Sequence, residues 1–284
     1  MSNLDRYAAK FAQLKKVGSK AFIPFTMLGY PNRDACLQTM KAFVDSGASA
    51  LELGLAFSDP MADGPTIQQA ANETIATGFS VDDAFNLIND IRKYAPEIPI
   101  GLLVYYNMVL KYDPSKFYKK ASAHGVDGIL IADLPAESAD EVADHAKLNN
   151  IKQIFIVSPL TDKIRLKAIL QYAGGFIYAV SRLGITGVEA RYDDQLKNLI
   201  ASVKAQSELP ICIGFGISNP QQAKTMCELG ADGVITGSKI IEIIRSSPQA
   251  DNQSALSEFL LAMVAAVTNY SAKSSADSSA PTPN

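Results

Sequence analysis

Short runs of almost continuous apolar residues recur along the chain and alternate with amphipathic stretches of helical period. There are eight such runs, at residues 21–27, 49–54, 98–105, 127–133, 152–157, 176–181, 210–215 and 232–237. Runs without polar alternation are typical of strands buried on both faces, as in a parallel sheet covered by helices. Glycine precedes several of them, in SGASALEL, HGVDGILI, GGFIYAV and LGADGVIT, where it can end a helix in the left-handed conformation. The pattern therefore predicts eight strand–helix units.

Eight such units over roughly 240 residues favour an α/β fold, a closed (β/α)8 TIM barrel, over two doubly wound sheets. No Pro-, Gly- or Ser-rich linker divides residues 20–270, so we predict a single barrel domain at 1–270. An extra N-terminal helix on the barrel floor is predicted from Leu4, Tyr7, Phe11 and Leu14, and a closing helix from residues 254–271. The segment 271–284 is rich in Ser, Ala and Pro and is predicted to be a disordered tail.

The composition excludes several classes of protein. Hydrophobic residues make up 48% of the chain and charged residues 19%, which excludes global disorder. A net charge of −3 gives no basic surface for nucleic acid or anionic membrane, and no apolar run approaches the roughly 20 residues of a membrane span. Three scattered cysteines argue against disulfides and two isolated histidines against a zinc site. We therefore expect a cytoplasmic protein without a metal.

Candidate chemistry begins in the second predicted strand. In SALELG, alternation places Leu51 and Leu53 toward the helices and Glu52 inside the barrel near its rim. A carboxylate there is either a structural group tied to amides or a tyrosine, or a general acid/base with a tuned pKa. The loop at 55–68 adds Asp59 and Asp63, which either cap turns or bind a small molecule at the barrel mouth. The long connection at 55–97 is expected on the active-site face.

Glycine-rich turns follow the last three predicted strands, with the sequences SRLGITG (181–187), GFGIS (214–218) and GSKI (237–240). Glycine lets backbone N–H groups approach an anion closely, and the start of a following helix adds partial positive charge. The alternative is that these glycines serve only as turn formers. Because loops after strands seven and eight are a recurrent phosphate position in such barrels, we predict a phosphate site.

Taken together, these motifs resemble those of one family, the α subunit of tryptophan synthase. Its signature reads approximately L-E-L-G-[IV]-P-F-S-D-P-x-A-D-G-P-x-I-Q, and this chain has LELGLAFSDPMADGPTIQ at 51–68. The resemblance extends to FIPFTMLGYP, LLVYYN, GVDGILIADLP, YAVSRLGITG, GFGIS and ADGVITGS. It covers the chain from about residue 3 to 270.

The resemblance implies retro-aldol cleavage of indole-3-glycerol phosphate to indole and glyceraldehyde 3-phosphate. By this resemblance, Glu52 would be the principal acid/base and Asp63 would accept a hydrogen bond from the indole N–H. Tyr178 would orient Glu52, and Thr186 would contact Asp63 from a loop that closes over the substrate. The remaining positions that it implies are Gly187, Gly216, Gly237 and Ser238 for the phosphate, and Phe25, Leu103 and Leu130 for the indole slot.

The resemblance also implies an α2β2 complex with a tryptophan synthase β subunit, to which indole is passed. No cofactor is implied in this chain, because pyridoxal phosphate belongs to the β partner. Ala56 replaces the proline usual before FSDP in the loop that faces that partner, which puts their communication in question more than the chemistry. The alternatives are a stand-alone lyase and a non-catalytic activator of β, and the presence of Glu52 and Asp63 disfavours the activator. The LELG…ADGP block disfavours another phosphate-binding barrel enzyme, such as an isomerase.

Overall fold

Eight parallel strands form a closed barrel in chain order, with β1 pairing with β8 to complete the ring. The computed structural model describes residues 5–180, 189–246 and 249–269. The strands are β1 (Ala21–Met27), β2 (Leu51–Gly54), β3 (Ile100–Val104), β4 (Gly128–Ile131), β5 (Lys152–Val157), β6 (Ala173–Val180), β7 (Ile211–Gly214) and β8 (Gly233–Thr236). The predicted (β/α)8 barrel is confirmed, and each predicted apolar run coincides with one strand, although β6 begins three residues before its run.

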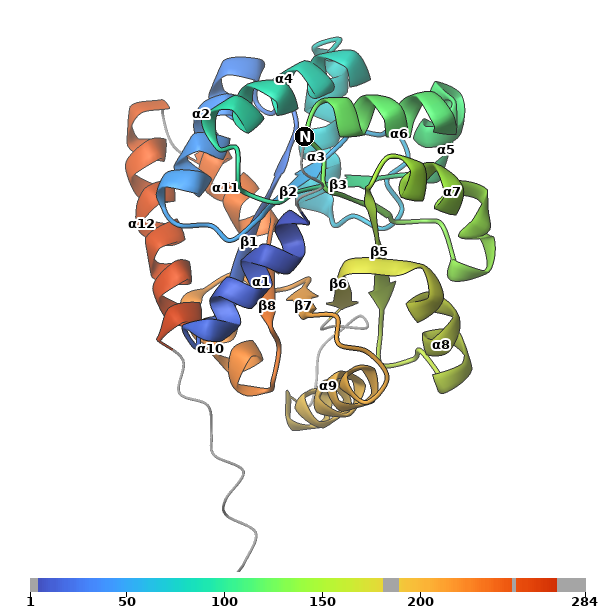
Figure 1. Cartoon of the computed structure of the whole chain (residues 1–284). Helices are drawn as coiled ribbons and strands as arrows, with labels where there is room; N and C mark the ends of the chain where they lie inside the picture. Colours follow the sequence, from blue (N-terminus) through green and yellow to red (C-terminus); the bar gives the residue numbers. More distant parts are fainter. Residues whose placement is uncertain (1–4, 181–188, 247–248, 270–284) are drawn as a thin grey trace, which may run out of the picture.

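Helices surround this ring on its outside (Figure 1). They are α1 (Arg6–Lys16), α2 (Arg33–Asp45), α3 (Pro65–Ala76), α4 (Val81–Tyr94), α5 (Tyr106–Tyr112), α6 (Pro114–Ala123), the 3-10 turn η1 (Ala136–Ser138), α7 (Asp140–Leu148), α8 (Lys163–Tyr172), α9 (Glu189–Lys204), α10 (Pro220–Glu228), α11 (Ser238–Ser246) and α12 (Gln249–Thr268). The predicted closing helix corresponds to α12, which begins at Gln249 rather than at residue 254. No helix in the described ranges has the length and apolarity needed to cross a membrane.

The predicted N-terminal helix is present as α1 and closes the floor of the barrel. Asp5 begins it by accepting a hydrogen bond from the Ala8 backbone N–H at 3.0 Å. Tyr7 is fully buried at the amino ends of the strands, where Gly101 leaves room for it. A Cβ at Gly101 would lie 2.7 Å from the Tyr7 hydroxyl, so this close approach requires glycine. The floor is therefore plugged by an aromatic side chain.

The core has two layers because successive strand residues point to opposite faces. Leu51 and Leu53 pack in the outer layer, between the strands and the helices. Phe25, Leu103 and Tyr178 belong to the inner layer, inside the ring of strands. Glu52 lies between the two leucines and lines an interior cavity, which confirms the orientation predicted from alternation.

The connection between β2 and β3 carries one helix more than the usual unit. A loop leads from Gly54 to α3, and α4 follows, so this connection holds two helices. The start of α4 is fixed by a capping box in which Ser80 and Asp83 bond to each other's backbone N–H groups. The loop before α3 lies at the carboxyl end of β2, as predicted for an active-site insertion. The predicted tail at 271–284 lies outside the described residues.

Candidate active site

A cavity of about 180 Å³ opens at the carboxyl ends of the strands, where barrels of this class carry their active sites. Its walls come from β1, β2, β3, β6 and β8 and from the loops that follow β2, β7 and β8. It brings together the predicted site residues Phe25, Glu52, Asp63, Leu103, Tyr178, Gly216, Gly237 and Ser238. Segments far apart in the sequence therefore meet at one small space.

Glu52 projects from β2 into this cavity and is only 5% exposed. Burial raises the pKa of Glu52 to about 8, and the neighbouring Asp63 carboxylate adds to the rise. No other described residue donates a hydrogen bond to Glu52 or pairs with it, so the alternative of a structural glutamate tied to amides gains no support. Below a pH of about 8 the carboxyl group is protonated and can donate a proton.

Asp63 reaches the same cavity from the loop between β2 and α3. Its carboxylate accepts a hydrogen bond from the Tyr105 hydroxyl at 3.0 Å. Burial raises the pKa of Asp63, and the Tyr105 hydrogen bond opposes that rise. The carboxylate does not cap α3, whose N-cap is Gly64 without a side-chain hydrogen bond. The other aspartate of this loop, Asp59, is exposed and accepts a hydrogen bond from the Ser58 hydroxyl. Asp63 is thus the loop aspartate available to a ligand.

Tyr105 is a site residue that the sequence analysis did not assign. It follows β3, donates to Asp63 and accepts the Ala62 backbone N–H at 3.1 Å, so it bonds to the loop at two points. The Phe57 ring stacks on Tyr105 with centroids 5.1 Å apart, which adds a third contact with the same loop. The motif LLVYYN was the available signal, but no local pattern links a tyrosine to an aspartate 42 positions away.

Tyr178 lies on β6 in the inner layer and is buried. Burial raises the pKa of Tyr178 well above its usual value, and the negative charge of Glu52 contributes, so the hydroxyl stays protonated. The ring lies over Gly214 of β7, where a Cβ would come within 2.1 Å of the hydroxyl oxygen. Glycine at position 214 is therefore required for Tyr178 to occupy the cavity wall.

The remaining walls form an apolar slot. Phe25 and Leu103 line it, as predicted, together with four apolar residues that were not predicted from the sequence, which are Ile67, Phe215, Ile217 and Ile235. Leu130 is buried in the inner layer and pairs in register with Leu103, but it does not line this cavity. The slot reaches no residue of β4, and the role of Leu130 in it stays a prediction.

Three of the residues predicted to bind phosphate line this cavity together. They are Gly216, Gly237 and Ser238, and Ser238 begins α11, where the first backbone N–H groups have no intrahelical acceptor. Phe215 has φ of 66° and Gly216 has φ of 78°, so the loop after β7 takes a conformation that is strained for Phe215. Such strain is typical of functional loops, which supports a binding role for this turn.

Two predicted site residues, Thr186 and Gly187, lie outside the described residues, and their roles stay predictions. The described residues also contain no group of three or more His, Cys, Asp and Glu side chains placed to hold a metal ion. The three cysteines are free and buried, at positions 36, 212 and 227.

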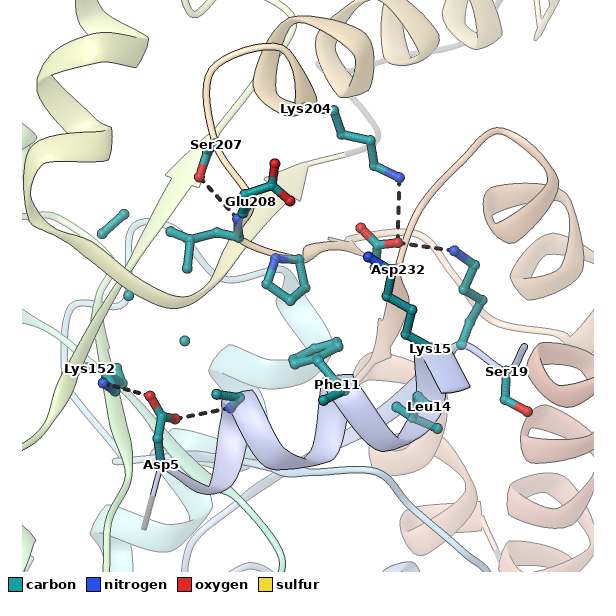
Figure 2. Close-up of a pocket in the computed structure, with 18 of the residues that line it drawn as sticks. Asp5, Phe11, Leu14, Lys15, Ser19, Lys152, Lys204, Ser207, Glu208 and Asp232 are labelled. Carbon is teal, nitrogen blue, oxygen red and sulfur yellow. Dashed lines mark hydrogen bonds and ion pairs between the residues drawn. The ribbon is translucent and has the colours of Figure 1, made fainter. Parts of the chain in front are cut away.

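A second and larger cavity, of about 840 Å³, lies at the amino ends of the strands beside α1. Figure 2 shows Phe11 projecting from α1 into it, with Asp5 and Lys152 at one end and Lys204 and Asp232 at the other. The two ion pairs have N–O distances of 2.7 Å and 3.4 Å. None of the predicted site residues lines this cavity.

Comparison with known proteins assigns the chain to a family. Residues 11–270 match the sequence profile described as "Tryptophan synthase alpha chain". The chain is 43% identical to the tryptophan synthase alpha chain of Methanothermobacter thermautotrophicus over 238 residues, which cover 84% of this chain and 87% of that one. It is 40% identical to the tryptophan synthase alpha chain of Francisella tularensis subsp. tularensis over 268 residues, covering 93% and 99% of the two chains.

Solved structures give the same result. The crystal structure of tryptophan synthase subunit alpha from Legionella pneumophila str. Paris superposes with a TM-score of 0.86 at 34% identity, covering 94% of this chain and 99% of that chain. A structure of Mycobacterium tuberculosis tryptophan synthase has a TM-score of 0.84 at 28% identity, covering 93% and 98%. The resemblance stated from the sequence is thereby confirmed.

Proposed function

The chain belongs to the tryptophan synthase alpha chain family, and from that premise we propose that its barrel cleaves indole-3-glycerol phosphate to indole and glyceraldehyde 3-phosphate. The family carries out this reaction as the lyase half-reaction of tryptophan synthesis. The observation that carries the proposal is a buried Glu52 that has no ion-pair or hydrogen-bond partner in the described ranges and shares an apolar cavity with Asp63. The residue roles below are part of the proposal.

Glu52 moves the protons of the retro-aldol step. Indole C3 takes a proton from Glu52, which leaves the ring positively charged, and the bond from C3 to the side chain then breaks. The electron pair of that bond returns to the ring and neutralises it, while the side-chain hydroxyl loses its proton and becomes the aldehyde carbonyl. A raised pKa of about 8 leaves Glu52 protonated at neutral pH, ready to protonate C3. After donating that proton, the carboxylate can accept the hydroxyl proton, so no proton is gained or lost overall.

Asp63 stabilises the positive charge that develops on the indole ring when C3 is protonated. Its carboxylate accepts a hydrogen bond from the indole N–H, in a site where burial strengthens electrostatic interactions. Tyr105 keeps the carboxylate in place, and its hydrogen bond favours the ionised form. The slot formed by Phe25, Leu103 and Ile235 provides flat apolar walls for the ring.

The phosphate occupies the opposite end, at Gly216, Gly237 and Ser238, where glycine and the start of α11 suit an anion. We assign Gly187 to the same group, and Thr186 to the loop that closes over substrate and contacts Asp63. Tyr178 positions Glu52 from the facing wall.

The chain works with a β subunit, as its family does. We propose an α2β2 complex in which this chain needs no cofactor of its own and pyridoxal phosphate is bound by the β partner. We place the complex in the cytoplasm, which suits three free cysteines in the chain.

Indole release from indole-3-glycerol phosphate tests the proposal, with the purified chain alone and with a tryptophan synthase β subunit. We expect slow release that increases greatly when β is added. The Glu208→Gln variant, with an exposed carboxylate at the other end of the barrel, serves as the matched control for Glu52→Gln. Absence of indole release by the wild-type chain under both conditions would overturn the proposal.

One observation favours a second candidate function, a stand-alone lyase. Ala56 stands at the start of the loop that carries Asp63, where the family signature given above has proline. Alanine leaves the backbone freer than proline does, which weakens a rigid connection between this loop and a partner. Fast indole release that β does not change would identify the stand-alone enzyme.

A further inference from the structure

The charges around the active-site cavity are unbalanced for a phosphorylated substrate. Three carboxylates line it, those of Glu52, Asp63 and Glu242. Among the described residues that line it, Lys239 provides the cationic side chain. A phosphate monoester carries about −1.5 to −2 charges at neutral pH, so it meets repulsion from any ionised carboxylate in this cavity.

Backbone groups compensate only part of this repulsion. The start of a helix contributes roughly half an elementary charge, which falls off within the first turn. Lys239 is the second residue of α11, directly after Ser238, so its ammonium group extends from the helix end that faces the predicted phosphate position. A lysine binds phosphate as a compact point charge and adds a full positive charge to this end of the cavity.

Lys239 is held in the absence of ligand by a weak ion pair. Its Nζ lies 3.6 Å from Glu242 Oε2, one turn further along α11, and the two side chains are 40% and 51% exposed. Exposed pairs of this kind contribute about 0–1 kcal/mol, because water and salt screen them. Little is therefore lost when Lys239 leaves Glu242 for a phosphate, and the half-exposed Glu242 remains solvated.

We propose that Lys239 binds the phosphate of the substrate and that Glu242 competes for Lys239, so that this pair sets the affinity and selectivity for phosphorylated ligands. The inference rests on the proposed function and deepens it, because it adds a side chain to a site otherwise built from glycine and serine backbone. Lys239 acts in binding, and the protons of the reaction remain with Glu52.

Steady-state kinetics separate binding from chemistry. The Lys239→Met variant keeps the aliphatic stem and loses the charge, and we expect KM for indole-3-glycerol phosphate to rise about tenfold with kcat within twofold. Lys239→Arg should retain most of the affinity, and Glu242→Gln should lower KM severalfold. Lys16→Met, which removes an exposed charge from α1 at the other end of the barrel, is the matched control and should change neither constant.

Calorimetry tests the anion site without the reaction, with glycerol 3-phosphate as the probe and glycerol as its uncharged control. We expect binding of the phosphate probe alone, weakened about tenfold in Lys239→Met and strengthened in Glu242→Gln. An unchanged KM and an unchanged Kd in Lys239→Met would overturn the inference while leaving the proposed lyase intact. A wild-type chain that binds the probe through Lys239 but releases no indole would support the anion site and overturn the proposed function.

Discussion

The two cavities at the ends of the barrel differ in size and in how their charges are held. The larger one, beside α1, measures about 840 Å³, and both of its aspartates are ion-paired, Asp5 with Lys152 and Asp232 with Lys20 and Lys204, while its glutamate, Glu208, is exposed to solvent. Burial alone would raise the pKa of Asp5, but the hydrogen bond from the Ala8 N–H and the charge of Lys152 outweigh it. The pKa is therefore lowered overall, and the carboxylate stays ionised. The smaller one, about 180 Å³, holds Glu52 without a partner among the described residues.

This difference shows that volume alone does not identify the site of chemistry. A paired, partly exposed carboxylate is already in its preferred state and offers little to a reaction. A buried carboxylate without a partner is costly to ionise and can exchange a proton near neutral pH. These properties support the smaller cavity as the proposed active site, although the larger cavity offers more space.

The largest effect is expected when the unpaired carboxyl group is removed. Glu52→Gln should lower kcat for indole release by about a hundredfold or more, or about 3 kcal/mol, because glutamine cannot transfer the proton. The same substitution at Glu208 in the larger cavity should leave kcat unchanged. Retained turnover in Glu52→Gln would show that the carboxyl group in the smaller cavity is no more important for the reaction than the one in the larger cavity.

The same variant has a pH-dependent effect on stability. In the unfolded chain Glu52 ionises near 4.5, and in the folded chain burial raises its pKa to about 8, so the folded state binds more protons between these values. Wild-type stability therefore falls as the pH rises through this window, at about 1.4 kcal/mol for each unit of pKa shift. Glu52→Gln should match the wild type at pH 4 and have a Tm several degrees higher at pH 8, as thermal unfolding would show. If the variant and the wild type had the same Tm at pH 4 and also at pH 8, Glu52 would have to be paired in solution.

A smaller loss is expected for the second carboxylate. Asp63→Asn keeps the shape and removes the negative charge that would stabilise the protonated ring, so kcat/KM should fall about tenfold to a hundredfold. Steady-state kinetics and thermal unfolding together check the assignment. A lower Tm with unchanged kcat/KM would mean that Asp63 only fixes its loop.

A change of packing should have the next largest effect. A Cβ at Gly214 would lie 2.1 Å from the Tyr178 hydroxyl, so Gly214→Ala should displace Tyr178, destabilise the fold by about 1–3 kcal/mol and lower kcat/KM. The matched substitution in the larger cavity is Gly174→Ala, whose Cβ would meet only the flexible Lys152 chain at 3.3 Å. The unfolding free energy of Gly174→Ala should stay within about 0.5 kcal/mol of the wild-type value. Equal unfolding free energies for the two variants would contradict this explanation.

The smallest effect on activity is expected in the larger cavity itself. Asp232 accepts hydrogen bonds from Lys20 and from the Ile211 backbone N–H, at 3.0 Å and 3.1 Å. Asp232→Asn should cost about 1 kcal/mol of unfolding free energy and leave kcat within twofold of the wild type. A large loss of kcat with an unchanged Tm would show that the charges of this cavity act on the chemistry.

The barrel and part of its site follow from local patterns in the sequence. Burial on both faces makes the strands apolar throughout, and alternation alone places Glu52 inside the ring. The apolar pattern predicts the sixth strand from residue 176, but β6 begins at Ala173. The pattern misses this start because Gly174 and Gly175 have low strand propensity and lie where the register between β5 and β6 shifts.

The rest depends on contacts between distant segments. The bond between Tyr105 and Asp63 arises from the register of β2 and β3 and the path of one loop, which no local pattern records. Leu130 occupies the same inner layer as Leu103, yet the cavity lies against other strands and does not reach it. Which inner-layer residues line the cavity is decided by the closed ring, not by the periodicity of any one strand.

The contact between Gly214 and Tyr178 also limits the order in which this barrel can diverge. A side chain at position 214 is excluded while the tyrosine ring fills the adjacent space. Shortening Tyr178 first would open room on β7, and only then could alanine or serine be accepted at position 214 without strain. A descendant that keeps Tyr178 must therefore also keep Gly214. A descendant that has lost Tyr178 can accept other residues at position 214 and so acquire a pocket of different shape.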